Sequence, residues 1–245
     1  MCGLAKVKSS AKEGAMSATG GIVFSGFVLL LIAAIILLVR RDSKRQAEAY
    51  HSAMSRFAHD WIVCDVSNVY VHKYFMHQMK EEFKRVKQWT PDFGDEFPSV
   101  FVMVFDLDDF KQVNDRFGHL SGNEVLSFFG AVLHAELRAT DMAGRFGGDE
   151  FIAFGHCSRD SAGAIARRIA QTFRARVFRW HGKKIRLNVS VGLAFFEPRD
   201  KSECEVINRA DQALYAVKRQ GKNGLGFAEN SGIAIERFSK PKIKA

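Results

Sequence analysis

Three acidic side chains, Asp106, Asp108 and Asp109, follow a strongly apolar run. The run SVFVMVFDLDDF at 99–110 is rich in Val and Phe, so we expect a buried β-strand that ends at these acids. Carboxylates held at a strand end are suited to Mg²⁺, which takes one or two of them and leaves positions for phosphate oxygens. The segment therefore predicts metal-assisted phosphate chemistry.

A second acidic pair lies farther along the chain, within MAGRFGGDEFIAF at 142–154. Gly147 and Gly148 between two apolar runs predict a tight β-hairpin, with Asp149 and Glu150 at its tip. Taken alone, such a sequence is also typical of an ordinary solvated turn. Its combination with the first acidic segment favours a shared site.

Better-known phosphate and metal motifs are absent from the sequence. An EF-hand fails because Phe110 and Lys111 stand where a ligand and the turn glycine belong, and Phe117 stands where the bidentate Glu belongs. Neither a Walker A motif nor GxGxxG occurs. The cysteines Cys2, Cys64, Cys157 and Cys204 form no CxxC pair, so we expect neither disulfides nor zinc.

The segment 22–39 is the most apolar part of the chain, and no charged residue occurs from Gly14 to Val39. As a helix it would extend about 27 Å, close to the hydrocarbon thickness of a bilayer. A signal peptide would have a shorter run and a cleavage site, whereas this one continues into Arg40; a buried core helix is the other alternative. We expect one transmembrane helix at 22–39, after a short tail at 1–21.

A juxtamembrane helix is expected at 40–64. Apolar residues recur there at spacings of three and four, at Ala47, Tyr50, Met54, Phe57, Trp61 and Cys64. This pattern is typical of a short coiled coil or of an amphipathic helix packed on its own domain. A second helical stripe, at Phe75, Met79, Phe83 and Val86, is expected to face the core, and Pro91 and Pro98 indicate a loop before the first acidic strand.

The composition is globular: of 245 residues, 47% are hydrophobic and 26% are charged. This excludes a disordered chain and fits one domain with an extension. The net charge of +9 favours anionic partners without naming one. The basic and aromatic residues form no stripe of the kind that binds nucleic acid, so we expect no nucleic-acid partner.

Five segments, taken together and in order, resemble the diguanylate cyclase family, which is named for its GGDEF motif. They are GGDEF at 147–151, FDLDDFKQVND at 105–115, GHLSGNEVL at 118–126, SVGLAFF at 190–196 and ADQALYAVKRQGKN at 210–223. The resemblance implies an α+β fold at 65–230, a nucleotidyl-cyclase-like palm whose mostly antiparallel central sheet is flanked by helices. Residues 231–245 would be a basic C-terminal tail. The family joins two GTP molecules into cyclic di-GMP.

The resemblance also implies roles for the acidic residues. Asp106, Asp149 and the backbone carbonyl of Leu107 would bind two Mg²⁺ ions, for which Mn²⁺ could substitute. Glu150 would assist metal binding or deprotonate the attacking hydroxyl. The expected substrate-binding residues are Asp109, Phe110, Lys111, Asn114, Asn123, Lys218 and Lys222. The lysines would contact phosphates, and the amides near Asp109 and Phe110 would cradle them.

Two of these positions depart from the family pattern. Asn123 stands where the family has an acid that accepts hydrogen bonds from guanine, and Lys222 replaces an arginine. The amide NH₂ of Asn123 would oppose a guanine donor but would pair with adenine, so we expect relaxed base selectivity. Asn114, the other base-contacting position, matches the family.

Five residues before the GGDEF motif, Arg138 and Asp141 match the RxxD product-binding site of the family, and Arg168 is a candidate helper. The alternative is an ordinary surface pair. We expect feedback inhibition by cyclic di-GMP at this site.

Taken together, these observations predict a membrane-anchored diguanylate cyclase that works as a homodimer. GTP is cytoplasmic, so the catalytic domain is expected on the cytoplasmic side of a bacterial inner membrane; the charges flanking 22–39 favour this orientation only mildly. Two alternatives remain open. One is an adenine-tolerant or mixed cyclic dinucleotide synthase, and the other is a non-catalytic receptor for GTP or cyclic di-GMP.

Overall fold

The computed structural model describes residues 37–38, 40–42, 44–46, 48–49, 62–88, 99–229 and 232–239. The chain divides into two compact units, Met1–Ala58 and His59–Ala245. In the first unit the described positions from 37 to 49 are helical. None of the helices in these ranges is long and apolar enough to cross a membrane. The predicted transmembrane helix lies outside the described residues except at its last positions, as does most of the predicted coiled coil, so both stay predictions.

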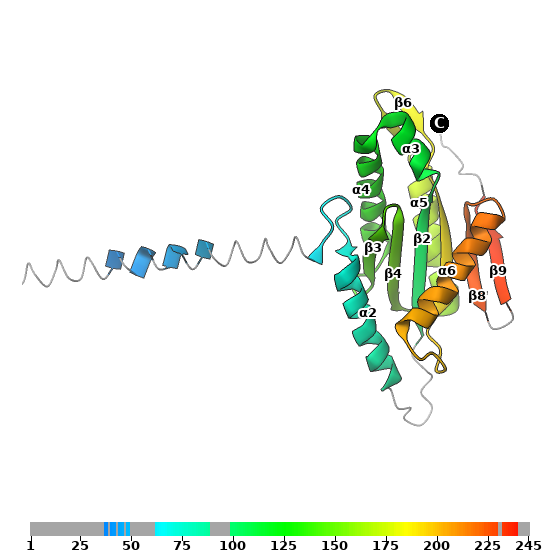
Figure 1. Cartoon of the computed structure of the whole chain (residues 1–245), viewed down its shortest axis with the longest axis horizontal. Helices are drawn as coiled ribbons and strands as arrows, with labels where there is room; N and C mark the ends of the chain where they lie inside the picture. The colour runs from blue at the N-terminus through cyan, green and yellow to red at the C-terminus, as the bar shows by residue number, and fades with distance from the viewer. Residues whose placement is uncertain are drawn as a thin grey trace, which may run out of the picture. The chain divides into compact units, whose positions relative to one another are not determined.

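The second unit is built on a mixed sheet with the strand order β1-β3-β4-β2-β7-β8-β9 in the described part of the chain (Figure 1). Its strands are β1 (Tyr70–Val71), β2 (Val100–Asp108), β3 (Met142–Gly147), β4 (Glu150–His156), β7 (Asn188–Phe195), β8 (Gly224–Glu229) and β9 (Gly232–Arg237). The β1–β3 and β7–β8 pairs are parallel, and the other neighbouring pairs are antiparallel. The strands β5 (Phe178–Trp180) and β6 (Lys183–Ile185) form a separate hairpin. The expected α+β fold is present.

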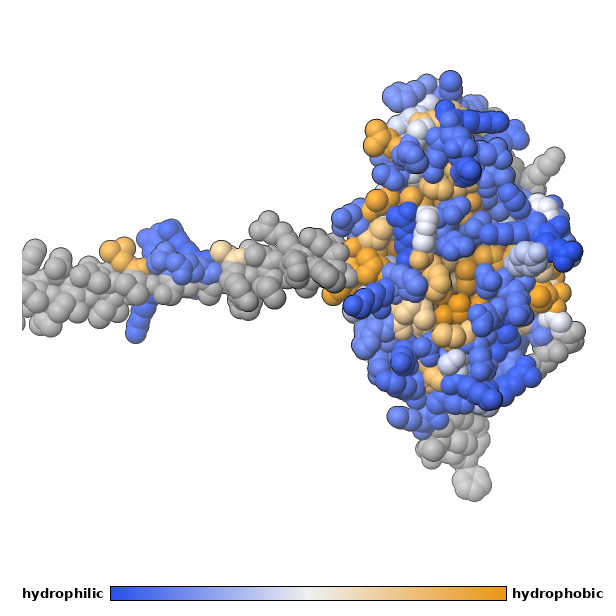
Figure 2. Space-filling view, viewed as in Figure 1, coloured by the Kyte–Doolittle hydropathy of each residue, from blue (hydrophilic) through white to orange (hydrophobic). Residues whose placement is uncertain are grey.

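Helices pack on both faces of the sheet. They are α2 (His72–Lys87), α3 (Phe110–Phe117), α4 (His119–Glu136), α5 (Arg159–Ala175) and α6 (Glu203–Arg219). Core residues from α2 and α6 meet one face, and those from α4 and α5 meet the other. The predicted stripe Phe75, Met79, Phe83 and Val86 is the buried side of α2, which confirms that it faces the core. Apolar side chains also reach the surface between α2 and α6 (Figure 2).

The central strand β2 separates these two cores. Phe101, Met103 and Phe105 point toward α4 and α5, while Val102 and Val104 belong to the opposite core. All five are buried, which explains why this strand is apolar on both faces rather than alternating. The prediction of a buried strand ending in acids is confirmed. The strand runs on to Asp108, so Asp106 and Asp108 share the face that carries α2 and α6.

Strands β7 and β8 are parallel because α6 crosses between them. Gly192 of β7 lies directly under this helix, where a Cβ atom would come within 1.9 Å of the carbonyl oxygen of Ala210. Only glycine permits this approach. The close packing fixes α6, and with it Lys218, over the sheet.

Two predicted boundaries are corrected by the structure. Residues 232–237, assigned to a C-terminal tail, form β9 and pair with β8, so the sheet extends past residue 230. The lysine-rich end of the chain obscured the alternation of Ile233 and Ile235 in this short edge strand. In the β3–β4 hairpin the turn is Gly148–Asp149 rather than Gly147–Gly148, and Gly147 pairs with Glu150. A bulge after Arg145 produces this shift.

Candidate active site

The two predicted acidic segments meet at one end of the central strands. Asp106 of β2 is the register partner of Glu150 in β4, and the N–H of Leu107 donates to the carbonyl oxygen of Asp149 at 3.3 Å. The hairpin turn is thereby fastened to the end of β2. Asp106 and Asp149, which are 43 positions apart in the chain, come together through antiparallel pairing.

The electrostatics of this pair reflect its partial burial. Burial raises the pKa of the Asp149 carboxyl, and the negative charge of Asp106 raises it further. Lys218 and Arg145 act in the opposite direction. Lys218, from the last turn of α6, places Nζ 2.7 Å from Asp106 Oδ2. The site is thus two half-buried carboxylates with one ammonium group.

These donor atoms fit a divalent cation whose remaining coordination positions are filled by phosphate oxygens of a ligand. In the described residues no three His, Cys, Asp or Glu side chains cluster as a self-sufficient metal site. Mg²⁺ does not need one, because it binds through one or two carboxylates and phosphate oxygens. Asp106 and Asp149 supply that number, with the backbone of Leu107 beside them. Glu150 starts β4 with an exposed side chain.

The predicted phosphate-binding residues surround the N-terminus of α3. Asp109 precedes this helix in a left-handed conformation (φ 60°), which Asp tolerates better than most residues. Lys222 Nζ lies 2.8 Å from Asp109 Oδ1. Phe110 begins α3, and Lys111 is exposed on its first turn. Asp109, Phe110, Lys111 and Lys222 are therefore neighbours, as expected.

The two predicted base-contacting residues lie on α3 and α4. The Oδ1 atom of Asn114 is buried and has no hydrogen-bond partner among the described residues. It lies above Gly122, where a Cβ atom would approach it to 2.0 Å. Asn123, the next residue, is exposed on α4. An orphaned acceptor of this kind fits a ligand that brings an N–H donor.

Sequence reasoning missed a buried polar cluster beside the site, in which one carboxylate accepts two hydrogen bonds. Asp108 is only 8% exposed, and it accepts hydrogen bonds from Ser190 Oγ (2.7 Å) and from the N–H of Asn223 (2.9 Å). Burial is the main reason that its pKa is raised. The contacts hold the turn of Gly221, Lys222 and Asn223, all three of which have positive φ. The signal in the sequence was that Asp108 shares the strand face of Asp106.

Arg145 was also missed, although it contacts the β3–β4 turn directly. Its Nη2 donates to the carbonyl oxygen of Gly148 at 2.7 Å, and its Nη1 lies 3.5 Å from Cys64 Sγ. One side chain therefore joins the turn before Asp149 to the loop at the start of the domain. Nothing in the spacing of the sequence indicates this link.

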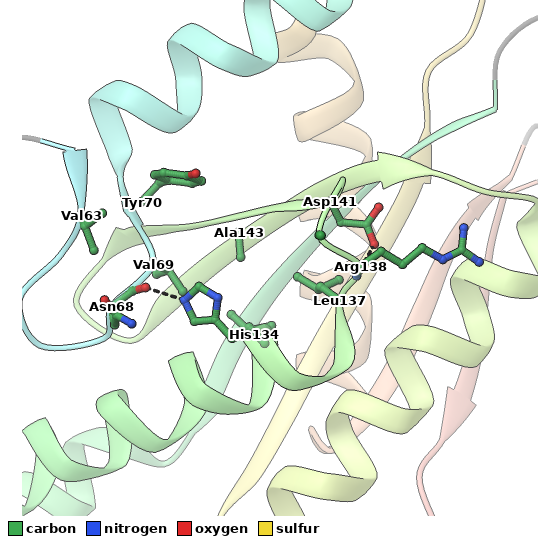
Figure 3. Close-up of a pocket in the computed structure, with 11 residues that line it drawn as sticks. Val63, Asn68, Val69, Tyr70, His134, Leu137, Arg138, Asp141 and Ala143 are labelled. Carbon is green, nitrogen blue, oxygen red and sulfur yellow. Dashed lines mark hydrogen bonds between the residues drawn. The ribbon is translucent and has the colours of Figure 1, made fainter. Parts of the chain in front are cut away.

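The predicted product site is a separate surface at the end of α4. The N–H of Arg138 donates to Asp141 Oδ2 at 2.9 Å, and the Arg138 side chain is exposed. A cavity of about 400 Å³ adjoins both residues, and His134 lines another part of it. Figure 3 shows the guanidinium of Arg138 pointing away from His134. Arg168 of α5 bonds Glu136, two residues before Arg138. The three predicted residues are thus brought to one region.

Comparison with known proteins identifies the family of the domain. Residues 65–224 match the family model described as "Diguanylate cyclase, GGDEF domain". The chain is 32% identical over 139 residues to diguanylate cyclase A of Treponema denticola, covering 56% of this chain and 38% of that protein. It is 31% identical over 194 residues to diguanylate cyclase DgcP of Pseudomonas aeruginosa, covering 78% and 28%. The chain therefore spans less than half the length of these relatives.

Solved structures give the same fold. The coiled coil and GGDEF domain of DgcB from Caulobacter crescentus, in complex with cyclic di-GMP, has a TM-score of 0.68 at 24% identity, covering 76% of this chain and 96% of that one. SiaD of Pseudomonas aeruginosa, in complex with its activator SiaC, has a TM-score of 0.64 at 25% identity, covering 89% and 81%. With the motifs, the fold and the matched domain in agreement, the chain belongs to the GGDEF diguanylate cyclase family.

Proposed function

We propose that this chain condenses two GTP molecules into cyclic di-GMP and pyrophosphate. The observation that supports this most strongly is the convergence of Asp106, Asp149 and Lys218 at the junction of β2, the GGDEF turn and α6. Two carboxylates and a cation at a rigid sheet end suit a triphosphate that arrives with its metal ions.

In this proposal each residue acts on a defined part of the substrate. Asp106, Asp149 and the Leu107 carbonyl hold two Mg²⁺ ions, which would neutralise charge as a 3′-hydroxyl attacks the α-phosphate and pyrophosphate leaves. Lys218, which contacts Asp106 in the structure, would contact a phosphate when that carboxylate holds a metal ion. Lys111 and Lys222 bind the terminal phosphates, and Asn114 accepts from the base. Glu150, which is exposed at the start of β4, would assist metal binding or deprotonation of the attacking hydroxyl.

The reaction needs two such domains face to face, because each holds one substrate. We assign this task to a homodimer formed through the helix at 40–64, which would raise the effective concentration of the partner domain. The apolar segment 22–39 would anchor the dimer in the inner membrane, with the GGDEF domain in the cytoplasm where GTP is found.

Product feedback is proposed at Arg138 and Asp141, with Arg168 assisting. Two observations support it: the guanidinium of Arg138 is exposed, and Arg168 contacts Glu136, two residues before Arg138. Added cyclic di-GMP should inhibit the wild-type protein, and Arg138→Ala should abolish that inhibition while leaving turnover intact. Equal inhibition of both proteins would contradict this assignment.

Base selectivity is the one point at which a second function is favoured. Asn123 offers an NH₂ donor where guanine also presents donors, a mismatch of about 1–3 kcal/mol if the contact is desolvated. The same amide complements the N1 and N6 atoms of adenine. We propose that the site also accepts ATP, so that mixed cyclic dinucleotides can form.

The experiment incubates the purified full chain and Mg²⁺ with GTP alone, ATP alone or an equimolar mixture, and identifies the products by mass spectrometry. Cyclic di-GMP from GTP supports the cyclase, and a mixed product supports relaxed selectivity. Asn123→Asp should remove the mixed product and retain cyclic di-GMP. Turnover of GTP with no competition by ATP would refute the adenine proposal alone. Binding of GTP without any product would indicate a receptor instead.

A further inference from the structure

A basic cavity lies beside the β5–β6 hairpin, and Asn223, from the turn at 221–223 described above, is one of its lining residues. It has a volume of about 450 Å³, within the range of small-molecule sites. Its wall includes four cationic side chains, Arg174, Arg176, Lys184 and Arg186, and no carboxylate is among its described lining residues. Figure 1 places β6 at the same end of the domain as α3.

Two of these cations, Arg174 and Arg176, contact neutral groups. Arg174 donates to Asn188 Oδ1 (3.3 Å) and to the carbonyl oxygen of Ser239 (2.7 Å), and the guanidinium of Arg176 lies over the Phe128 ring. Burial lowers the pKa of Arg174, and the charge of Asp108 opposes this effect. Four positive groups without a lining carboxylate suit a doubly charged phosphate.

The remaining wall indicates what the phosphate is attached to. Val177, Ile185 and Leu187 supply apolar surface, and Asn223 also lines the cavity. Its Oδ1 is buried without a hydrogen-bond partner in the described part of the chain. A ligand that fits would bring a phosphate, a flat apolar body and an N–H or O–H donor.

The chain's own C-terminal end is a poor occupant. Ser239 lies beside Arg174, and the residues that follow carry Lys240, Lys242 and Lys244. Their positive charge would oppose entry into a basic cavity.

We propose that this cavity is a second nucleotide site, which takes a nucleoside monophosphate or a comparable phosphorylated nucleoside. The phosphate binds Lys184 and Arg186, the base lies along the apolar wall, and Asn223 Oδ1 accepts from the ligand. This goes beyond the cyclase reaction, and no catalytic acid contributes to it.

The test measures binding without turnover. Equilibrium dialysis of labelled GMP against the full chain, with Mg²⁺ removed by chelation, counts the molecules bound per chain. Lys184→Ala/Arg186→Ala should bind one GMP fewer than the wild type. The matched control, Lys183→Ala/Lys201→Ala, loses the same charge from residues outside the cavity and should bind as the wild type does.

Three outcomes would overturn the proposal. They are an unchanged number of bound GMP molecules in Lys184→Ala/Arg186→Ala, an equal loss in the control, and equally effective displacement of GMP from the site by glycerol 3-phosphate or inorganic phosphate. The last would show that only phosphate is recognised, as for a lipid headgroup or a free anion. Because no product is measured, failure here leaves the cyclase proposal standing, and the reverse also holds.

Discussion

At the scale of single residues, the carboxylate of Asp106 has two competing partners, Lys218 and a metal ion. Its Oδ2 is 2.7 Å from Lys218 Nζ, and the side chains of Lys218 and Asp106 are 32% and 14% exposed. The proposed mechanism requires the same carboxylate to bind a metal ion. The ammonium group therefore competes with the cation until a phosphate attracts it away.

This competition predicts the behaviour of Lys218→Met. Without nucleotide, the variant should bind Mn²⁺ about fivefold more tightly, because an ion pair worth about 1 kcal/mol no longer opposes the metal. Turnover of GTP should nevertheless fall at least tenfold, since a phosphate contact is lost. Electron paramagnetic resonance of free Mn²⁺ measures the affinity.

Lys222→Met is the matched control, because Lys222 pairs with Asp109 rather than with a proposed metal ligand. Its Mn²⁺ affinity should stay within twofold of the wild type. Unchanged or weaker Mn²⁺ binding by Lys218→Met would show that Lys218 does not compete for Asp106.

Cys64 gives a second prediction at this scale. Burial alone would raise the pKa of its thiol, but hydrogen bonds from Ser67 and Arg145 outweigh burial and lower it to about 7. The folded-state pKa is depressed, so the thiolate forms as the pH rises through 7. Alkylation of Cys64 by iodoacetamide, followed by peptide mass spectrometry, should reach half its maximal rate near that pH.

The pKa of Cys157 is raised, mainly by burial, so Cys157 should react only at higher pH. In Arg145→Ala the midpoint for Cys64 should move upward, because one of the stabilising hydrogen bonds is gone. A midpoint above 8.5 in the wild type would contradict the contact between Cys64 and Arg145.

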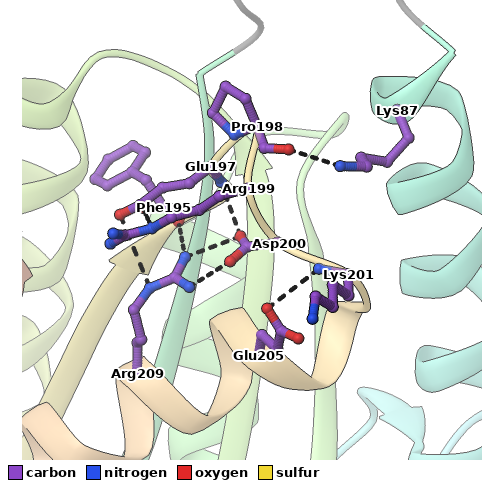
Figure 4. Close-up of polar contacts among 9 residues, drawn as sticks. All are labelled: Lys87, Phe195, Glu197, Pro198, Arg199, Asp200, Lys201, Glu205 and Arg209. Atoms are coloured by element: carbon purple, nitrogen blue, oxygen red, sulfur yellow. Dashed lines mark hydrogen bonds and ion pairs between the residues drawn. The ribbon is translucent and has the colours of Figure 1, made fainter.

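At the scale of elements, a polar network ties the end of β7 to the start of α6. Asp200 is 1% exposed, accepts from the N–H of Glu197 (2.8 Å) and pairs with Arg209, which also donates to the carbonyl oxygen of Phe195 (Figure 4). Lys87 at the end of α2 donates to the Pro198 carbonyl oxygen at 2.7 Å. The network sets the course of α6 and so the position of Lys218.

Asp200→Ala should therefore destabilise the domain by about 3 kcal/mol, because the Glu197 N–H loses its acceptor and Arg209 loses the carboxylate that it pairs with. Urea unfolding followed by circular dichroism measures the loss. The control Lys201→Ala alters an exposed neighbour and should change the free energy of unfolding by less than about 0.5 kcal/mol. Equal stability of the two variants would mean that the network does not hold α6.

Local sequence patterns predicted the elements whose buried residues follow one another in a run or at regular spacing within one segment. The apolar run of β2 and the stripe of α2 are examples, since periodicity alone identifies their buried residues. The cluster of Asp108, Ser190 and Asn223 could not be found this way. It joins residues 82 and 115 positions apart, which meet only after β2, β7 and the turn at 221–223 have packed.

The edge strand β9 was not predicted from the sequence for a related reason. An edge strand needs little apolar sequence, because one of its sides has no neighbour in the sheet. The prediction that the motif residues share one site came from the family resemblance, because spacing alone does not relate residues so far apart. Lys218 and Asp106, for example, are 112 positions apart.

At the scale of the whole molecule, the proposed cyclase reaction requires two GGDEF domains to meet. The domain presents Asp106 and Asp149 at a sheet end, and one domain holds one substrate. The rate per chain should then rise with the density of protein in the membrane or micelle, unless the helix at 40–64 already keeps every chain paired. In either case the product requires both half-sites to be intact.

The decisive measurement is the formation of cyclic di-GMP from GTP and Mg²⁺ by the full chain, compared with Asp149→Asn. The wild type should form product, and the variant should lose activity on the order of 100-fold or more, because one of the two proposed metal-binding carboxylates becomes a neutral amide. Circular dichroism should show that both proteins are equally folded. Equal rates of cyclic di-GMP formation in the two proteins, or no product from a folded wild type that binds GTP, would contradict the proposed function.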